Sequence, residues 1–195
     1  MRYVAKKTEV INPKINSPEW DKAEAVTLTT RWGMTAPETN AKLLRGPEGI
    51  SVLLNSKETE LRMECTEENG WVCRDSCMEF FFKPDPWDTR YFNFELNPKG
   101  VMHLGFGEGR HGRVPVEVRD CFDIETIPES GNWSVKIYIP DAFLLTYVKN
   151  IGKVCKGNFY KCGDYTVQEH YASWCDPEVP EPDYHQPDFF GFIEL

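Results

Sequence analysis

A strict alternation of apolar and polar residues in Tyr91–Asn97 is the sequence feature that most constrains the fold. Phe92, Phe94 and Leu96 occupy every second position, and polar side chains lie between them. Because successive side chains of a β-strand point to opposite faces, this pattern predicts a strand with one face in a core. The turn formers Pro98 and Gly100 then end it. The opposite face of this strand is predicted to be polar.

Short stretches of the same kind occur along the whole chain. Ser76–Lys83 and the segment Met102–Phe106 alternate in the same way, so the three segments are predicted to form a meander. Further strands are predicted within the hairpin Ala41–Asn55 and over Val116–Ile127, Trp133–Ile139, Gly157–Asp164 and Phe189–Leu195. Only Pro140–Lys149 is typical of a helical turn. We therefore predict an all-β fold, a two-sheet antiparallel β-sandwich of the jelly-roll or immunoglobulin type with one short helical turn.

The length of 195 residues favours one core, and residues 1–195 are predicted to form a single domain. The acidic, proline-rich stretch Cys175–Asp188 is the most linker-like part of the chain. It is followed, however, by the apolar run from Phe189 to Ile193, which requires burial. Cys175–Asp188 is therefore predicted to be an internal loop.

The charge and the cysteine content limit the partners and the compartment. A net charge of −9 repels phosphate backbones and anionic lipids, so neither nucleic acid nor a membrane is an expected partner. The segment Met1–Val10 lacks the apolar stretch of a signal peptide, which predicts a cytoplasmic protein, or a secreted one if a signal has been trimmed. The seven cysteines are expected to be reduced, because an odd number cannot pair fully within one chain.

The polar face of the predicted meander is the strongest candidate for a site. Asparagine is depleted in strands, so its alternation with glutamate and tyrosine calls for a reason. Hydrogen bonding to ligand hydroxyls is one reason, since carboxylates accept and amides both donate and accept. A solvated face, or pairing with Arg74, Arg90 or Lys83, is the alternative. The residues concerned are Glu79, Tyr91, Asn93, Glu95 and Asn97.

Three tryptophans, Trp71, Trp87 and Trp174, lie among turn formers and charged residues. An aromatic ring can stack on the apolar face of a small ligand while polar groups bind its edge, which is a common plan for a ligand site. Each tryptophan considered alone can equally be a core anchor or can pin a loop.

Other functions remain open from the residues. Glu79 and Glu95 could be the carboxylate pair of an O-glycosyl hydrolase. Met102 or His103 could ligate haem, although strand alternation points the two to opposite faces. A purely structural interaction domain would instead present an extended apolar patch. The cysteine spacings do not match structural zinc sites, and no cofactor is predicted.

Several motifs together resemble a known family. They are Trp71-Val-Cys-Arg-Asp-Ser-Cys-Met-Glu-Phe-Phe-Phe, Tyr91-Phe-Asn-Phe-Glu-Leu-Asn-Pro-Lys-Gly, Gly157-Asn-Phe-Tyr-Lys-Cys-Gly-Asp and His185-Gln-Pro-Asp-Phe-Phe-Gly. In this order, from Trp20 to Leu195, the chain resembles the carbohydrate-binding module family 9-like domains. The resemblance implies a β-sandwich that grips a terminal pyranose between two tryptophan rings. Calcium is often a structural ion in this family, and many members are attached to secreted glycosidases.

The resemblance also implies roles for individual residues. Trp71 and Trp174 match the two stacking rings, Glu79 matches a strand carboxylate, and Asn97 matches a strand asparagine. Glu95 stands where the family would have an arginine. We therefore expect a non-catalytic domain that binds a mono- or oligosaccharide in an aromatic-walled cleft and is linked to carbohydrate catabolism. The expected binding residues are Trp71, Glu79, Asn93, Glu95, Asn97 and Trp174.

Overall fold

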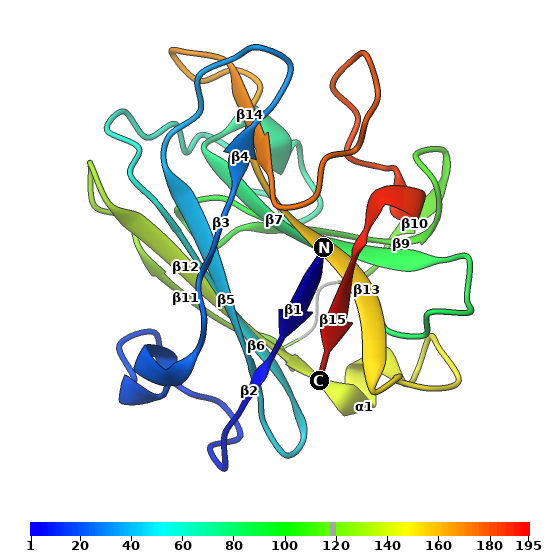
Figure 1. The fold of residues 1–195 in the computed structure, drawn as a ribbon. Coiled ribbons are helices and arrows are strands. Elements are labelled where there is room, and N and C mark those ends of the chain that lie inside the picture. The colour runs from blue at the N-terminus through cyan, green and yellow to red at the C-terminus, as the bar shows by residue number, and fades with distance from the viewer. Residues whose placement is uncertain (118–119) are drawn as a thin grey trace.

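Two β-sheets pack face to face in the computed structural model, which describes residues 1–117 and 120–195 (Figure 1). The larger sheet has nine strands within the described residues, and the smaller sheet has six. The large sheet runs β1 (Arg2–Val4), β15 (Gly191–Glu194), β13 (Val154–Gly163), β7 (Cys77–Lys83), β8 (Tyr91–Leu96), β9 (Met102–Glu108), β10 (Gly112–Pro115), and β14 (His170–Ser173) joins β4 (Thr29–Thr30) to β13. The small sheet runs β11 (Asp123–Ile127), β12 (Trp133–Pro140), β6 (Gly49–Ser56), β5 (Thr39–Arg45), β2 (Lys6–Lys7), with β3 (Val26–Thr27) beside β5.

Helical structure is confined to short turns. The predicted helical turn within Pro140–Lys149 is confirmed as α1 (Asp141–Leu144). Three 3-10 turns were not predicted, and they are η1 (Pro18–Lys22), η2 (Val72–Arg74) and η3 (Pro187–Phe189). No helix among the described residues is long and apolar enough to cross a membrane.

The predicted meander is confirmed as β7, β8 and β9, which pair antiparallel in chain order. The sheets are not wholly antiparallel, however, since β1 pairs with β15 and β2 pairs with β5 in parallel. The predicted strand over Val116–Ile127 was too long, because β11 begins only at Asp123. Residues 118–119 of that prediction lie outside the described residues.

Phenylalanines form the centre of the core between the two sheets. Phe80, Phe94 and Phe159 lie side by side on β7, β8 and β13, and all three are fully buried. The rings of Phe80 and Phe159 stack with centroids 5.0 Å apart. Aliphatic side chains from β5, β6 and β12 cover these rings from the small sheet. Burial of each such ring contributes about 1.5–3 kcal/mol to folding.

A buried ion pair joins the two sheets at one end of the sandwich. Lys161 on β13 points toward the core, and its Nζ lies 3.2 Å from Oε2 of Glu58, which follows β6. Glu58 also accepts hydrogen bonds from Nε1 of Trp133 on β12 and from Oγ of Ser76 before β7. Lys161 in addition donates to Nε2 of His170 on β14. The small sheet thus supplies an anion that the large sheet neutralises.

The first residues of the chain also connect the sheets. β1 lies in the large sheet and β2 in the small one, with Ala5 between them. Tyr3 is buried between the sheets, where its hydroxyl accepts from the backbone N–H of Leu43 and donates to the carbonyl of Glu24. Its ring packs edge-on against Trp174. Figure 1 shows the two marked chain ends at opposite ends of the parallel pair of β1 and β15.

The environment of His170 predicts a pH dependence of stability. Burial, together with the charge of Lys161, lowers the pKa of His170 from 6.5 to about 4. The unfolded chain therefore takes up a proton at a higher pH than the folded chain does, and stability falls as the pH drops from about 6.5 to about 4. We expect His170→Gln, which does not titrate, to reduce this slope in urea unfolding measured across the same pH range. An identical slope in both proteins would assign the pH dependence to other groups.

Candidate functional site

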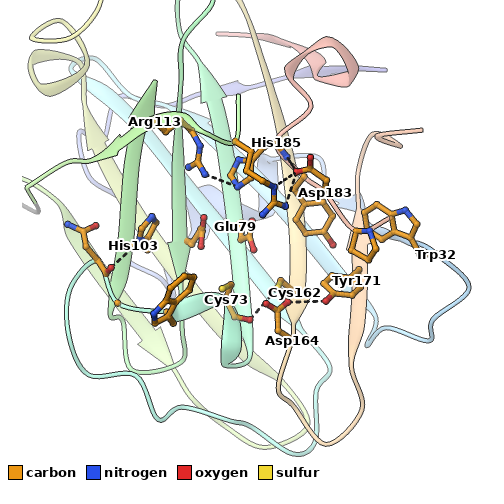
Figure 2. A pocket seen from close by; sticks show the side chains of 17 residues that line it. Trp32, Cys73, Glu79, His103, Arg113, Cys162, Asp164, Tyr171, Asp183 and His185 are labelled. Atoms are coloured by element: carbon orange, nitrogen blue, oxygen red, sulfur yellow. Dashed lines mark hydrogen bonds and ion pairs between the residues drawn. The ribbon is translucent and has the colours of Figure 1, made fainter. Parts of the chain in front are cut away.

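A cavity of about 330 Å³ lies on the face of the large sheet that points away from the small sheet. Its floor is a row of side chains that are direct neighbours across three strands, namely Glu79, Glu95 and His103. Glu79, Glu95 and His103 line the cavity, and Figure 2 shows Glu79 between His103 and Tyr171. A volume of this size suits a small ligand.

Two carboxyl groups stand side by side on this floor. Glu79 and Glu95 are paired across β7 and β8, and their residues are only 3% and 8% exposed. Oε1 of Glu95 accepts a hydrogen bond from Nδ2 of Asn93. The contact of Glu79 is weaker, with the thiol of Cys77 at 3.9 Å. Burial, and next the charge of Glu95, raises the pKa of Glu79 well above its usual value.

An arginine reaches the cavity from the neighbouring edge strand. Arg113 on β10 donates to Oδ1 of Asn93 on β8, and to do so its side chain passes over Gly105 on β9. A Cβ at Gly105 would lie 3.1 Å from the guanidinium and 2.5 Å from Oδ1 of Asn93. Glycine at this position therefore permits the guanidinium to cross β9.

The loop Cys175–Asp188, predicted to be internal, forms one wall of the cavity through Asp183, Tyr184 and His185. The imidazole of His185 stacks on Phe81, with centroids 4.9 Å apart. Its Nε2 accepts from Arg113, as Figure 2 shows, so Nδ1 carries the proton and donates to the hydroxyl of Tyr91. Burial and the charge of Arg113 lower the pKa of His185 to about 2, and its ring is neutral.

The same loop is held at Tyr184. Its ring stacks on Tyr160 with centroids 4.0 Å apart, and its hydroxyl donates to the carbonyls of Lys161 and Ala172. Because Lys161 belongs to the buried ion pair, these hydrogen bonds anchor the loop to the part of β13 that the ion pair also holds in place. The wall of the cavity is thus fixed to its floor.

Two tryptophans line the cavity from different loops. Trp71, before η2, is 68% exposed, and the guanidinium of Arg74 lies 4.7 Å from its ring centroid. The neighbouring Asn69, in the left-handed region at φ 60°, bonds to the backbone of β9 and fixes this loop. Trp32, after β4, is half-buried, and its Nε1 donates to the carbonyl of Val179.

A cluster of thiol, carboxylate and phenol occupies the far end of the floor. Cys162 and Tyr171 both donate to Oδ1 of Asp164 (Figure 2). Burial raises the pKa of the Cys162 thiol and of the neighbouring Cys73 thiol, and nearby carboxylates raise it further. These groups are therefore protonated donors and not thiolate nucleophiles.

The structure brings together some of the predicted residues and separates others. Trp71, Glu79 and Glu95 line the cavity, and Asn93 lies beneath it, bonded to Glu95. Trp87, which was also considered, is 92% exposed in the loop after β7 and does not line the cavity.

Asn97 and Trp174, which were also expected to bind the ligand, do not line this cavity. The amide of Asn97 is fully used by the protein: it donates to Asp75 and Cys65 and accepts from two backbone N–H groups of the following turn. Trp174 is 5% exposed in the core, where it packs against Tyr3 and Phe159. Asn97 therefore supports the loop that carries Trp71, and Trp174 supports the sandwich.

Sequence reasoning missed Trp32, Arg113 and His185 as cavity residues. Trp32 lies at left-handed φ 53°, which nothing in its segment indicates. Arg113 lies on a strand that was not predicted. His185 was quoted in the family motif but carried no assigned role. Its place in an aromatic motif near the end of the acidic loop was the one available signal.

The metal and haem hypotheses gain no support from side-chain positions. Within residues 1–117 and 120–195, no three His, Cys, Asp or Glu side chains form a group that could hold a metal ion. Met102 is buried between the sheets, whereas His103 lines the cavity on the opposite face. The two therefore cannot ligate the same haem.

A β-sandwich with a concave cavity on one sheet, where aromatic rings lie beside converging polar groups, defines a class of small-ligand-binding domains. This chain belongs to Carbohydrate-binding family 9, whose family model matches residues 20–195. The family assignment made from the sequence motifs is thereby confirmed. No curated protein matches the chain.

Solved structures share the fold at low sequence identity. A candidate carbohydrate-binding protein from Bacteroides uniformis ATCC 8492 has a TM-score of 0.85 at 24% identity, with 99% of this chain and 98% of that chain covered. A family 9 carbohydrate-binding module from Caldicellulosiruptor kristjanssonii in complex with cellotriose has a TM-score of 0.69 at 14% identity, covering 100% and 93%. A complex of such a module with glucose has a TM-score of 0.68 at 13% identity, covering 100% and 95%.

The anchoring of the cavity wall by His185 is testable by proteolysis. We expect His185→Ala to speed cleavage after Glu178 by a glutamate-specific protease tenfold or more, because two hydrogen bonds, each worth about 1 kcal/mol, are lost. Mass spectrometry of the fragments measures the rate. His111→Ala, at an exposed turn after β9, is the matched control and is expected to cleave like the parent. Equal rates in both variants would show that His185 does not hold the loop.

Proposed function

We propose that this domain binds a small saccharide, or the end of a saccharide chain, in the cavity on the large sheet and does not transform it. The observation that carries the proposal is the row Glu79, Glu95 and His103, fixed on three adjacent strands beside an exposed tryptophan. Membership of Carbohydrate-binding family 9 supports it. So do the fold relatives that hold cellotriose and glucose.

The bound ring would lie between aromatic surfaces and polar groups. Trp71 offers an open ring face for the C–H side of a pyranose, and Trp32 replaces Trp174 as the second aromatic side chain at the cavity. Glu79 and Glu95 accept hydrogen bonds from sugar hydroxyls. Asn93 acts as a positioning residue, because it orients Glu95 and receives Arg113.

The cavity needs little rearrangement to bind a ligand in this way. The carboxylates stand on strands, and the wall is tied down through Tyr184 and His185. A preformed site loses less conformational entropy on binding than a mobile one. We also propose that the domain serves carbohydrate breakdown by holding its saccharide for other proteins, in keeping with the attachment of family relatives to glycosidases.

A glycoside hydrolase is the second candidate, favoured by one observation. Glu79 and Glu95 are direct cross-strand neighbours, and the raised pKa of Glu79 is what a general acid requires. This candidate requires turnover of aryl glycosides that is lost in Glu79→Gln. We expect no release of the aryl group above the uncatalysed rate at any protein concentration, and release that depends on Glu79 would replace binding with catalysis.

Three tryptophan variants test the binding proposal. We expect Trp71→Ala to weaken saccharide binding about tenfold in calorimetric titration, because a lost stacking contact costs about 1 kcal/mol or more. Trp87→Ala, which removes an exposed ring outside the cavity, is expected to bind like the parent. Trp174→Ala is expected to lower the free energy of unfolding by about 3–5 kcal/mol, since it leaves a hole in the core. Binding that does not change in Trp71→Ala would contradict the proposal.

A further inference from the structure

The carboxyl pair on the floor of the cavity is short of partners. Glu79 is held by one thiol contact at 3.9 Å, and Glu95 by one amide donor at 2.8 Å. Within the described residues, no lysine or arginine nitrogen lies within ion-pairing distance of either carboxyl group. Buried carboxylates are normally paired or hydrogen-bonded, and two adjacent ones cannot both ionise without a compensating cation. The pair therefore requires a proton or a positive charge from outside the protein.

The cations near the pair are committed to other groups. Arg113 directs its guanidinium to Asn93, to the carbonyl of Gly109 and to Nε2 of His185. Arg110 forms an ion pair with Asp183 at 2.9 Å. Lys161 lies on the core side of β13, where Glu58 neutralises it. None of the three is directed at the two glutamates.

The ionisable side chains that line the cavity leave an excess of negative charge. Arg110 and Asp183 cancel, and His185 is neutral. Arg113 then stands alone against the remaining carboxyl groups of Glu79, Glu95 and Asp164. With the chain at a net charge of −9, this cavity repels an acidic sugar and attracts a cationic one.

We propose that the saccharide bound here is an amino sugar with a free, protonated amino group, and that Glu79 and Glu95 hold its ammonium between them. This inference rests on the proposed saccharide binding and deepens it. An ammonium has three N–H donors, enough to reach both carboxylates, and it supplies the charge that the pair lacks. The rest of the ring meets the same groups as a neutral sugar, with Trp71 against its apolar face.

The ammonium is the one group that separates this ligand from a neutral hexose. A hydroxyl at the same ring position has a single donor and no charge, so it leaves the adjacent carboxylates uncompensated. An acetylated amine keeps a single N–H donor, loses its charge and adds bulk at the crowded floor. Both changes weaken binding for the same electrostatic reason.

Calorimetric titration with matched sugars tests the inference. Glucosamine, galactosamine and mannosamine are each compared with the corresponding neutral hexose and N-acetylated sugar, at a pH where the free amine is protonated. We expect at least one hexosamine to bind tenfold or more tightly than its neutral partner, with the N-acetyl sugar weaker than both. Raised salt should reduce this preference, since it screens the attraction between charges.

Variants test whether the preference for a hexosamine depends on Glu79 and Glu95. In Glu79→Gln, and separately in Glu95→Gln, the ratio of hexosamine to hexose affinity should fall to about one. Glu181→Gln removes the same charge from an exposed position outside the cavity and should keep the ratio of the parent. Thermal unfolding confirms that each variant is folded, and the comparison of sugars on the parent protein stands without the variants.

The outcomes separate the inference from the function beneath it. Hexoses that bind as tightly as their hexosamines, with affinity dependent on Trp71, overturn the amino-sugar inference and leave saccharide binding in place. A preference that persists in both glutamine variants also overturns it. If none of the sugars binds, the proposed function and the inference fall together.

Discussion

The buried pair of Lys161 and Glu58 is the interaction on which the rest of the structure depends. It fixes the face of β13 that turns inward, and a slip of one residue would exchange every side chain between core and cavity. Lys161 and Phe159 point to the core, so Tyr160 and Cys162 must lie on the side of the sheet that carries the cavity. Loss of either charged partner leaves the other buried and unpaired, which lowers the free energy of unfolding by about 3–5 kcal/mol. A charge pair thus specifies the orientation of a largely apolar sandwich.

The strand register of the large sheet sets the geometry of the cavity. Its floor is a line of direct cross-strand neighbours, so the spacing of Glu79, Glu95 and His103 is set by the sheet itself and not by flexible loops. Arg113 brings a guanidinium from the edge strand β10 to the cavity. Glycine at position 105 leaves room for its side chain, and Nε2 of the neutral His185 accepts a hydrogen bond from it. The site therefore combines an acidic floor fixed on strands with one lining arginine, Arg113, that forms no ion pair with a lining carboxylate.

Strand faces followed directly from the sequence, because a period of two is visible without knowledge of the partners. The meander and its core side were predicted correctly from Tyr91–Asn97 and its neighbours. The identity of groups on the polar face was harder to interpret. Asn93 and Asn97 share a face and a residue type, yet one supports the cavity and the other holds a loop. That difference depends on Asp75, whose position the periodicity of β8 does not encode.

The positions of Trp32 and Trp174 could not be predicted from the residues around them in the sequence either. Trp174 lies one residue beyond β14, and its inward direction is set by the pairing of β14 with β13 and by the cover of Tyr3 from the first strand. Trp32 lines the cavity from a backbone in the left-handed conformation. Long-range pairing and unusual backbone angles are both decided by the assembled fold, so local flanking residues could not assign these two rings.

The parallel pairing of β1 with β15 has a consequence for synthesis on the ribosome. Residues 2–4 are synthesised 190 residues before their partners, residues 192–194. Until then β1 has no neighbour in the large sheet, and Tyr3 has no settled place beside Trp174. Closure of the sandwich at this edge therefore cannot take place until β15 has left the exit tunnel. Until β15 emerges, the nascent chain carries an open sheet edge, and this edge is where a chaperone would act to prevent pairing with a second chain.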